Sequence, residues 1–346
     1  MLKIMEHYLR NDYVRKSVCE KVDECVNDLR EHVMGITDSL KFTVTLCGSY
    51  GCGLASVSDS LVDVIVKIDG RLTRSLDQDG LVRAFSSAIK DWSSYGDDTP
   101  VMGNTGLIIC RTKDPSIVLR LLICNSNSFP IRSMYHTRLF LSYANSHSRV
   151  PVFVATIKRW ARVNNVSSPV ALPSCPLTGF HWTIISLACL IENNIIPNLG
   201  DLAKESMDIP RIQYGTNPSE HIFALIEESS HITTGHELPD LFVNFVNWLS
   251  KIDLLSREID LQTTSIVERP PMQRGYLVIR DPCSMTSINI VDSSIPQRDQ
   301  IVFGLKVRKA ASVAVEQMKR ASVSELVYTT LGARPGSNQR IDVAVP

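Results

Sequence analysis

The segment between Gly48 and Asp63 constrains the fold of this chain more than any other. Gly48-Ser49 interrupts a β-branched run at 42–47, and a second such run begins at Leu61. Glycine and serine favour turns, so the pattern predicts two strands joined through a turn. Side chains at i and i+2 of a strand share a face, so Leu61 and Asp63 should point to the same side. Asp63 carries a carboxylate, whereas the apolar side chain of Leu61 cannot bind a metal ion.

The composition predicts a folded chain without a strong overall charge. It has 346 residues and 44% hydrophobic content, which suffices for a large core and favours two domains over one. Lys+Arg and Asp+Glu are equal at 36 each, so the formal charge is zero. The net charge therefore predicts no overall electrostatic attraction to RNA, DNA or a membrane. A nucleic-acid-binding surface would have to be a local cluster of positive charge.

The nine cysteines predict reduced, buried thiols in an intracellular protein. None forms a CxxC pair or has a histidine at zinc-finger spacing. The longest apolar run, 184–191, is far shorter than the roughly 20 residues that span a bilayer. We therefore expect no membrane partner. The cytoplasm, the nucleus and the mitochondrial matrix are not distinguished.

Periodicity predicts an α+β protein in which a mixed sheet backed by helices precedes a mostly helical part. Strands are expected at 42–47, 61–68, 107–110, 117–124, 260–266 and 276–280. Helices are expected within 2–34 and at 76–92, 132–146, 150–165, 179–193, 237–256 and 296–326. We divide the chain into N-terminal helices at 1–34, a sheet domain at 35–130, a helical domain at 131–330 and an extended tail at 331–346.

Four further landmarks follow the Gly-Ser turn in order. They are IKRWARVNNV at 157–166, LTGFHW at 177–182, ELPDLFVNFVNWLSKID at 237–253 and IRDP at 279–282. With the turn and its acidic strand, they make residues 40–315 resemble the non-canonical poly(A) polymerases and terminal uridylyltransferases of the DNA polymerase β superfamily. The resemblance implies a nucleotidyltransferase palm, a poly(A)-polymerase-type helical domain, and a nucleotide bound in the cleft between them.

The resemblance also implies roles for individual residues. Gly48 and Ser49 would hold the triphosphate, and Lys158 and Arg162, one helical turn apart, would reach it. Phe180 takes the place of a tyrosine that stacks on the base. The list of nucleotide-binding residues is completed by Asn125 at the ribose and base and by Asp281 at the base edge. A histidine that favours UTP over ATP would fall near Ser287, which is not a histidine.

The departures from the family concern the metal site. Leu61 replaces the first metal ligand, and Arg120 occupies the position of the third, so that Asp63 alone survives. Arg120 interrupts the apolar run 117–123 and should be enclosed, and an enclosed cation requires a carboxylate or several acceptors. In the fold that the resemblance implies, the nearest candidate is Asp63. We expect a salt bridge between Arg120 and Asp63, whose loss would cost about 3–5 kcal/mol if the pair is buried.

Each of these residues also has an ordinary structural interpretation. Lys158 and Arg162 can belong to a solvated helix face, and Asp281 before a proline can form a turn. Phe180 can be a core aromatic residue, which is the preferred interpretation of Trp182. The basic segment 306–320 can contact RNA phosphates, although a solvated helix face is favoured there.

The leading hypothesis is a catalytically inactive homologue that binds RNA or acts as a scaffold in an RNA-processing or ribonucleoprotein assembly. It needs no cofactor, and it can retain weak UTP or ATP binding. The alternative is an active RNA uridylyl- or adenylyltransferase that uses Mg²⁺ with Asp63, a displaced Asp59 and an acid such as Asp114. A third possibility is a cleft closed by side chains, with only the outer surface functional.

Overall fold

A computed structural model describes residues 16–34, 41–56, 61–69, 78–92, 101–103, 107–124, 131–199, 237–262, 265–283 and 288–320. The α+β class is confirmed. The first fifteen residues and the tail at 331–346 lie outside the described residues, as do Asp59, Asn125 and Ser287.

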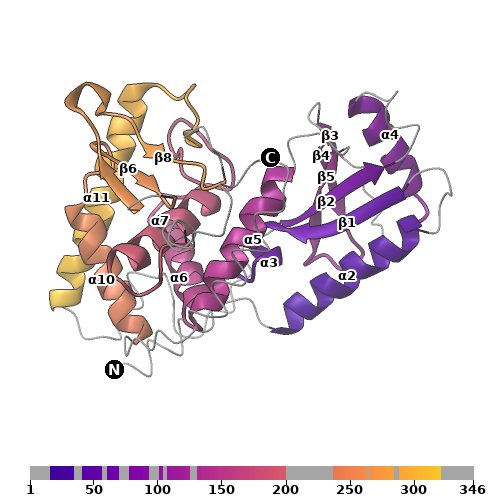
Figure 1. The fold of residues 1–346 in the computed structure, drawn as a ribbon, viewed down its shortest axis with the longest axis horizontal. Coiled ribbons are helices and arrows are strands. Elements are labelled where there is room, and N and C mark those ends of the chain that lie inside the picture. Colours follow the sequence, from indigo (N-terminus) through magenta and orange to yellow (C-terminus); the bar gives the residue numbers. More distant parts are fainter. Residues whose placement is uncertain are drawn as a thin grey trace, which may run out of the picture.

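The N-terminal part is built on a five-stranded mixed sheet in the order β1-β2-β5-β4-β3 (Figure 1). Its strands are β1 (Lys41–Cys47), β2 (Val62–Asp69), β3 (Val101–Gly103), β4 (Leu107–Arg111) and β5 (Val118–Cys124). Only the central pair β2 and β5 is parallel, and its register sets Asp63 directly opposite Arg120. The two residues singled out from the sequence are therefore cross-strand neighbours.

One face of this sheet is covered by the helices α2 (Lys16–Met34) and α4 (Gln78–Ala88). The covering residues of α2 are buried and recur every three or four positions, as one face of a helix requires: Val22, Val26, Leu29 and Val33. Alternation along β2 sends its even-numbered residues, Val62 to Ile68, into the same core. The odd-numbered residues, including Asp63, must then lie on the opposite face.

That opposite face carries little apolar material and meets helix α5 (Ile131–Ser146). A small cluster of Cys47, Ile65 and Cys124 packs there against Met134 of α5. The short helix α3 (Gly48–Gly51) leads out of β1 at the same place and contacts both β2 and α5. In Figure 1, α3 and α5 lie between the five-stranded sheet and the rest of the molecule.

The C-terminal part consists of helices and a second, three-stranded sheet in the order β7-β6-β8. Its remaining elements are α6 (Val150–Val163), α7 (Gly179–Glu192), α10 (Leu238–Lys251), β6 (Arg257–Asp260), β7 (Ser265–Glu268), β8 (Val278–Ile279) and α11 (Gln297–Arg320). The predicted strand at 260–266 is wrong, because Asp260 ends β6 and a turn follows before β7.

The core of this part is centred on three aromatic residues from different helices. The rings of Trp160 and Trp182 meet edge to face with centroids 5.8 Å apart, and Phe245 packs in the same way on Trp160 at 6.1 Å. Trp182 is fully buried and donates its indole N–H to Val166 O at 2.9 Å, so the interpretation of Trp182 as a core residue is confirmed. Among the helices described here, none combines the length and the apolar character needed to span a membrane.

Candidate functional site

A cavity of about 700 Å³ lies between the helical part and the face of the five-stranded sheet that α2 and α4 do not cover. Residues from β1, β2 and β5 line one side, and residues from α5, α6, α7 and the segment after β8 line the other. It brings together Gly48, Ser49, Leu61, Asp63, Arg120, Lys158, Arg162, Phe180 and Asp281. The possibility of a cleft closed by side chains is therefore wrong for the described residues.

Gly48 begins α3 with a backbone conformation that favours glycine. Its φ is +64°, in the left-handed region, and a Cβ built there would lie 2.5 Å from Asp63 Oδ2. The N–H of Gly48 donates to Thr137 Oγ1 at 2.9 Å, and this hydroxyl in turn donates to Ser133 O at 2.7 Å. The turn is thus packed directly on the Asp63 carboxylate and tied to α5.

Arg120 and Asp63 form a two-pronged ion pair on the floor of the cavity. Arg120 Nε donates to Asp63 Oδ1, and Arg120 Nη2 donates to Asp63 Oδ2 at 2.8 Å. Burial disfavours the guanidinium charge, but the hydrogen bond and the charge of Asp63 outweigh this effect and raise the pKa of Arg120. The predicted salt bridge is confirmed, and it engages both oxygens of the carboxylate.

Arg120 is less enclosed than the sequence predicted. The side chain of Arg120 is 36% exposed and that of Asp63 is 17% exposed, because both lie on the cavity wall rather than inside the core. A guanidinium has five N–H donors, and two of Arg120's are directed at Asp63. Loss of the ion pair should therefore reduce the free energy of unfolding by less than the ~3–5 kcal/mol expected for a buried pair.

The residues that the structure describes around Asp63 do not fit a pair of Mg²⁺ ions. Magnesium needs oxygen ligands, whereas Leu61 offers none and both oxygens of Asp63 are bound by Arg120. Asp114 does not supply the missing acid: it bonds Ser116 and Lys21 and is not among the described residues that line the cavity. The hydrogen bonds from Ser116, with the contribution of Lys21, lower the pKa of Asp114.

Helix α6 contributes two cations to the opposite wall. Lys158 is 4% exposed and donates to Leu54 O at 3.0 Å, while Arg162 is partly buried. The interpretation of Lys158 as part of a solvated helix face is therefore wrong. Leu54 N donates to Ser49 O at 2.8 Å, so Lys158 also supports the loop that follows the Gly-Ser turn.

An aromatic cluster and a carboxylate form another wall of the cavity. The ring centroid of Phe180 lies 5.0 Å from that of His136 and 5.6 Å from that of Phe140. Asp281 is only 3% exposed, and its Oδ1 is 2.7 Å from His136 Nε2. Phe180 packs against the core, as the structural interpretation expects, and it also lines the cavity; its stacking on a base stays a prediction.

Sequence reasoning missed several residues of the cavity lining, among them His136, Thr137 and His181. His181 accepts the backbone N–H of Thr178 on Nδ1 at 3.0 Å, and Nε2 lies 3.2 Å from Ile290 O. Burial lowers the pKa of His181, so the neutral ring caps α7. The position of His181, three residues after Thr178, was the available signal for this cap. His136 and Thr137 stand in no motif.

Comparison with known proteins extends the description of the fold. No model of a known family and no curated protein matches the sequence. Among solved structures, that of a GLD-2/RNP-8 complex matches with a TM-score of 0.68 and 15% identity, covering 96% of this chain and 98% of that one. The Cid1 poly(U) polymerase with Mg 3′-dATP matches at 0.68 and 17%, covering 95% and 97%.

A third structure, mtPAP in complex with UTP, matches with a TM-score of 0.73 and 15% identity, covering 95% of this chain and 70% of that one. At these identities the likeness concerns the fold. The chain has the fold of the non-canonical poly(A) polymerases and terminal uridylyltransferases, and the resemblance noted in the sequence is confirmed at that level.

Proposed function

We propose that this protein is a non-catalytic homologue of the terminal nucleotidyltransferases, which binds a nucleotide or an RNA end in its cavity and serves as an RNA-binding or scaffolding subunit of an RNA-processing or ribonucleoprotein assembly. The observation that carries the proposal is the ion pair of Arg120 with both carboxylate oxygens of Asp63. In this fold family, metal ions align the attacking hydroxyl and neutralise the charge that develops during phosphoryl transfer. Arg120 donates to both oxygens of the Asp63 carboxylate, which would otherwise bind these metal ions.

The charges of the cavity favour an anion without a divalent metal. The described lining contains three cations (Arg120, Lys158 and Arg162) and two acids (Asp63 and Asp281), which leaves one positive charge if the histidines are neutral. Arg120 exposes 36% of its side chain to the cavity, and three of its N–H donors are not directed at Asp63. Guanidinium groups suit phosphate oxygens, so Arg120 and Arg162 are the phosphate ligands in this proposal.

Other residues of the cavity lining supply the contacts for a base. Phe180 offers an aromatic ring for stacking, and the Asp281 carboxylate can accept from a base edge. Asn125 is proposed to contact the ribose, Gly48 and Ser49 the phosphates, and Lys158 to hold their loop in place. Without a metal ion the triphosphate loses a strong partner, so we expect weak binding of UTP or ATP.

The proposed partners rest on the fold and on its neighbours. One neighbour was solved as a complex with a protein, RNP-8, and the others carry nucleotides. We infer that this chain contacts RNA, protein subunits of an RNA-processing complex, or both. We infer an intracellular location from the cysteines, since none of the nine forms a disulfide in the described residues.

An extension assay tests the loss of catalysis. The protein is incubated with an RNA primer, Mg²⁺ or Mn²⁺ and each nucleoside triphosphate in turn, beside the Asp63→Ala variant. We expect no extension by either protein. Extension that Asp63→Ala abolishes would establish instead an active uridylyl- or adenylyltransferase, with Asp59 as a candidate second ligand.

A binding assay tests nucleotide recognition separately. Labelled UTP and ATP are titrated in EDTA and in Mg²⁺, and we expect affinities that agree within about threefold, because Arg120 already occupies the carboxylate a metal would need. Arg162→Met should weaken binding by about tenfold or more, as the loss of a charged hydrogen bond does. Arg159→Met is the matched control, since Arg159 lies on the same helix and does not line the cavity. Binding that requires Mg²⁺ would contradict the proposal.

A further inference from the structure

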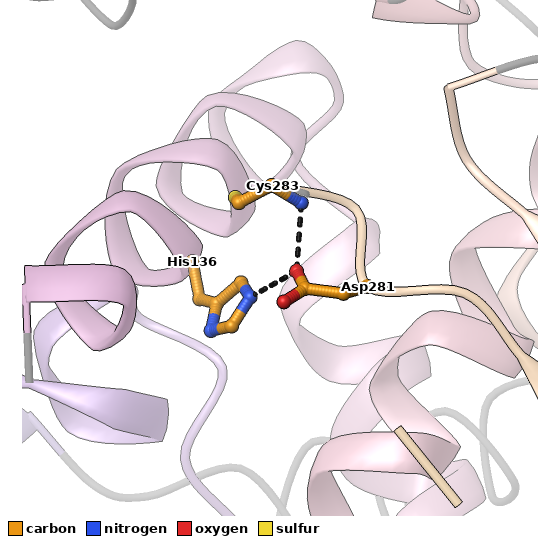
Figure 2. Close-up of side chains that lie close together, drawn as sticks. All are labelled: His136, Asp281 and Cys283. Atoms are coloured by element: carbon orange, nitrogen blue, oxygen red, sulfur yellow. Dashed lines mark hydrogen bonds and ion pairs between the residues drawn. The ribbon is translucent and has the colours of Figure 1, made fainter. Parts of the chain in front are cut away.

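Three side chains of the types that bind metal ions meet beside the cavity, and none of them belongs to the Arg120–Asp63 pair. His136 comes from α5, and Asp281 and Cys283 come from the segment after β8 (Figure 2). One imidazole nitrogen, one carboxylate oxygen and one sulfur lie within 4.8 Å of one another. His136 and Asp281 also line the cavity, so water can reach the group from that side.

The His136 and Asp281 side chains and the backbone of Cys283 are held in position without a metal. His136 Nε2 lies 2.7 Å from Asp281 Oδ1, and the backbone N–H of Cys283 donates to the same oxygen at 2.8 Å. The segment itself is fixed by a hydrogen bond from Asp281 N to Ile288 O at 2.8 Å and by one from Gln262 Nε2 to Pro282 O at 2.8 Å. Asp281 is 3% exposed and His136 15%, so little freedom is left to be lost on binding.

The donor set selects the kind of ion. One sulfur, one nitrogen and one oxygen suit zinc, whereas Mg²⁺ takes oxygen ligands. Tetrahedral Zn²⁺ bonds sulfur at about 2.3 Å and nitrogen or oxygen at about 2.0–2.2 Å. Such bond lengths set ligand atoms within the 4.8 Å span observed, after a small opening of the His136–Asp281 contact.

We propose that His136, Asp281 and Cys283 form a binding site for Zn²⁺, with water from the cavity in the fourth position. The Cys283 thiol loses its proton to solvent as the sulfur–zinc bond forms. The ion replaces the contact between His136 Nε2 and Asp281 Oδ1, so Nε2 gives its proton to solvent and the neutral ring bound to zinc carries its one proton on Nδ1. The bound ion would tie α5 to the segment after β8, two elements that are far apart in the sequence. In the metal-free protein, burial and the nearby Asp281 raise the pKa of the Cys283 thiol, so it is a poor nucleophile on its own.

The test uses the full chain after removal of metals with a chelator, and it needs no nucleotide. Zn²⁺ is titrated by calorimetry, and Co²⁺ is used as a spectroscopic probe because a cobalt–thiolate bond gives a charge-transfer band. We expect one ion per chain, a cobalt–thiolate band, and a rise in melting temperature with Zn²⁺ but not with Mg²⁺. The absence of both the band and the rise would overturn the proposal.

Two variants assign the ligands. Cys283→Ala and His136→Ala should each abolish the cobalt–thiolate signature at this site and weaken Zn²⁺ binding by more than about tenfold, since even outer-shell partners of a metal are worth 10–100-fold. Cys175→Ala is the matched control: Cys175 is partly buried like Cys283, forms no disulfide and is not part of the group. The assignment would be refuted if Cys283→Ala and Cys175→Ala bound Zn²⁺ with equal affinity. It would also be refuted if Cys175→Ala, rather than Cys283→Ala, lost Zn²⁺ binding.

The inference is independent of the proposed nucleotide binding, although the two meet at Asp281. A zinc ion on Asp281 would compete with a base that uses the same carboxylate. Zinc binding is measured without a nucleotide, and RNA extension is measured without zinc. A negative result for the zinc site therefore does not contradict the proposed function, and the reverse also holds.

Discussion

Replacing Arg120 by methionine measures what the ion pair contributes to folding. Methionine keeps the apolar stem of the side chain but removes the charge, so the Asp63 carboxylate, 17% exposed, is left without its cation. Exposed pairs are worth about 0.2–1 kcal/mol, and breaking a buried pair costs about 3–5 kcal/mol. With Arg120 36% exposed, we expect Arg120→Met to lower the free energy of unfolding by about 1–3 kcal/mol.

A double-mutant cycle with Asp63→Asn isolates the interaction itself. At an effective dielectric constant of about 20, two charges 4 Å apart attract by about 4 kcal/mol. Desolvation of both groups offsets a large part of this attraction, so we expect a coupling energy of about 1–2 kcal/mol. Asparagine preserves the shape of Asp63 and removes its charge, so the double variant should be more stable than the sum of the two single losses predicts.

Urea unfolding of the four proteins at equal ionic strength provides the measurement. Independent sites add within about 0.3–0.5 kcal/mol, so a coupling energy below this range would refute the ion pair as a stabilising contact. Repetition at high salt checks the exposure of the pair, because a partly exposed interaction should weaken and a buried one should hardly change.

Three further predictions concern other residues of the site. Gly48→Ala should lower the free energy of unfolding by about 2 kcal/mol or more in urea, because a left-handed backbone and the contact with Asp63 both oppose a Cβ; a change below about 0.5 kcal/mol would contradict that geometry. Burial lowers the pKa of His181, so below pH ~6.5 the unfolded chain takes up a proton that the folded chain resists, and stability should fall as the pH drops. Urea titrations from pH 8 to 5 should show this fall in the parent and a flatter profile in His181→Asn, and identical profiles would refute it. The double variant Leu61→Asp/Arg120→Asp should gain Mn²⁺ binding that calorimetry detects and the parent lacks, whereas equal binding by both would contradict our account of the metal site.

The main features of the sheet and its site could be predicted because they depend on short-range patterns. Period-two alternation placed Leu61 and Asp63 on one face, and a charged residue in the apolar run of β5 required a partner there. The parallel register then makes Arg120 the direct neighbour of Asp63. The choice of Asp63 as the partner did not come from local pattern, because the two residues are 57 positions apart in sequence. It came from the family resemblance, which sets both residues in one metal site.

The features that could not be predicted depend on contacts between distant segments. The exposure of Arg120 is set by the cavity between the sheet and α5, α6 and α7, and no pattern in β5 carries that information. His136 meets Asp281 across 145 positions of sequence, and Thr137 meets Gly48 across 89. Neither contact follows from periodicity. The division into domains and the roles of the nucleotide-binding residues stay predictions.

The pairing of Asp63 with a residue on the adjacent strand also bears on how such a chain can change over time. Arg120→Asp alone would set two carboxylates against each other with no cation between them, and Leu61→Asp alone would add a second acid beside a guanidinium that can neutralise only one. Each single step meets unfavourable electrostatics before any metal-assisted activity could reward it. Under the proposed function, a metal centre here would require Leu61→Asp and Arg120→Asp together, so single substitutions are expected to leave the pocket without one.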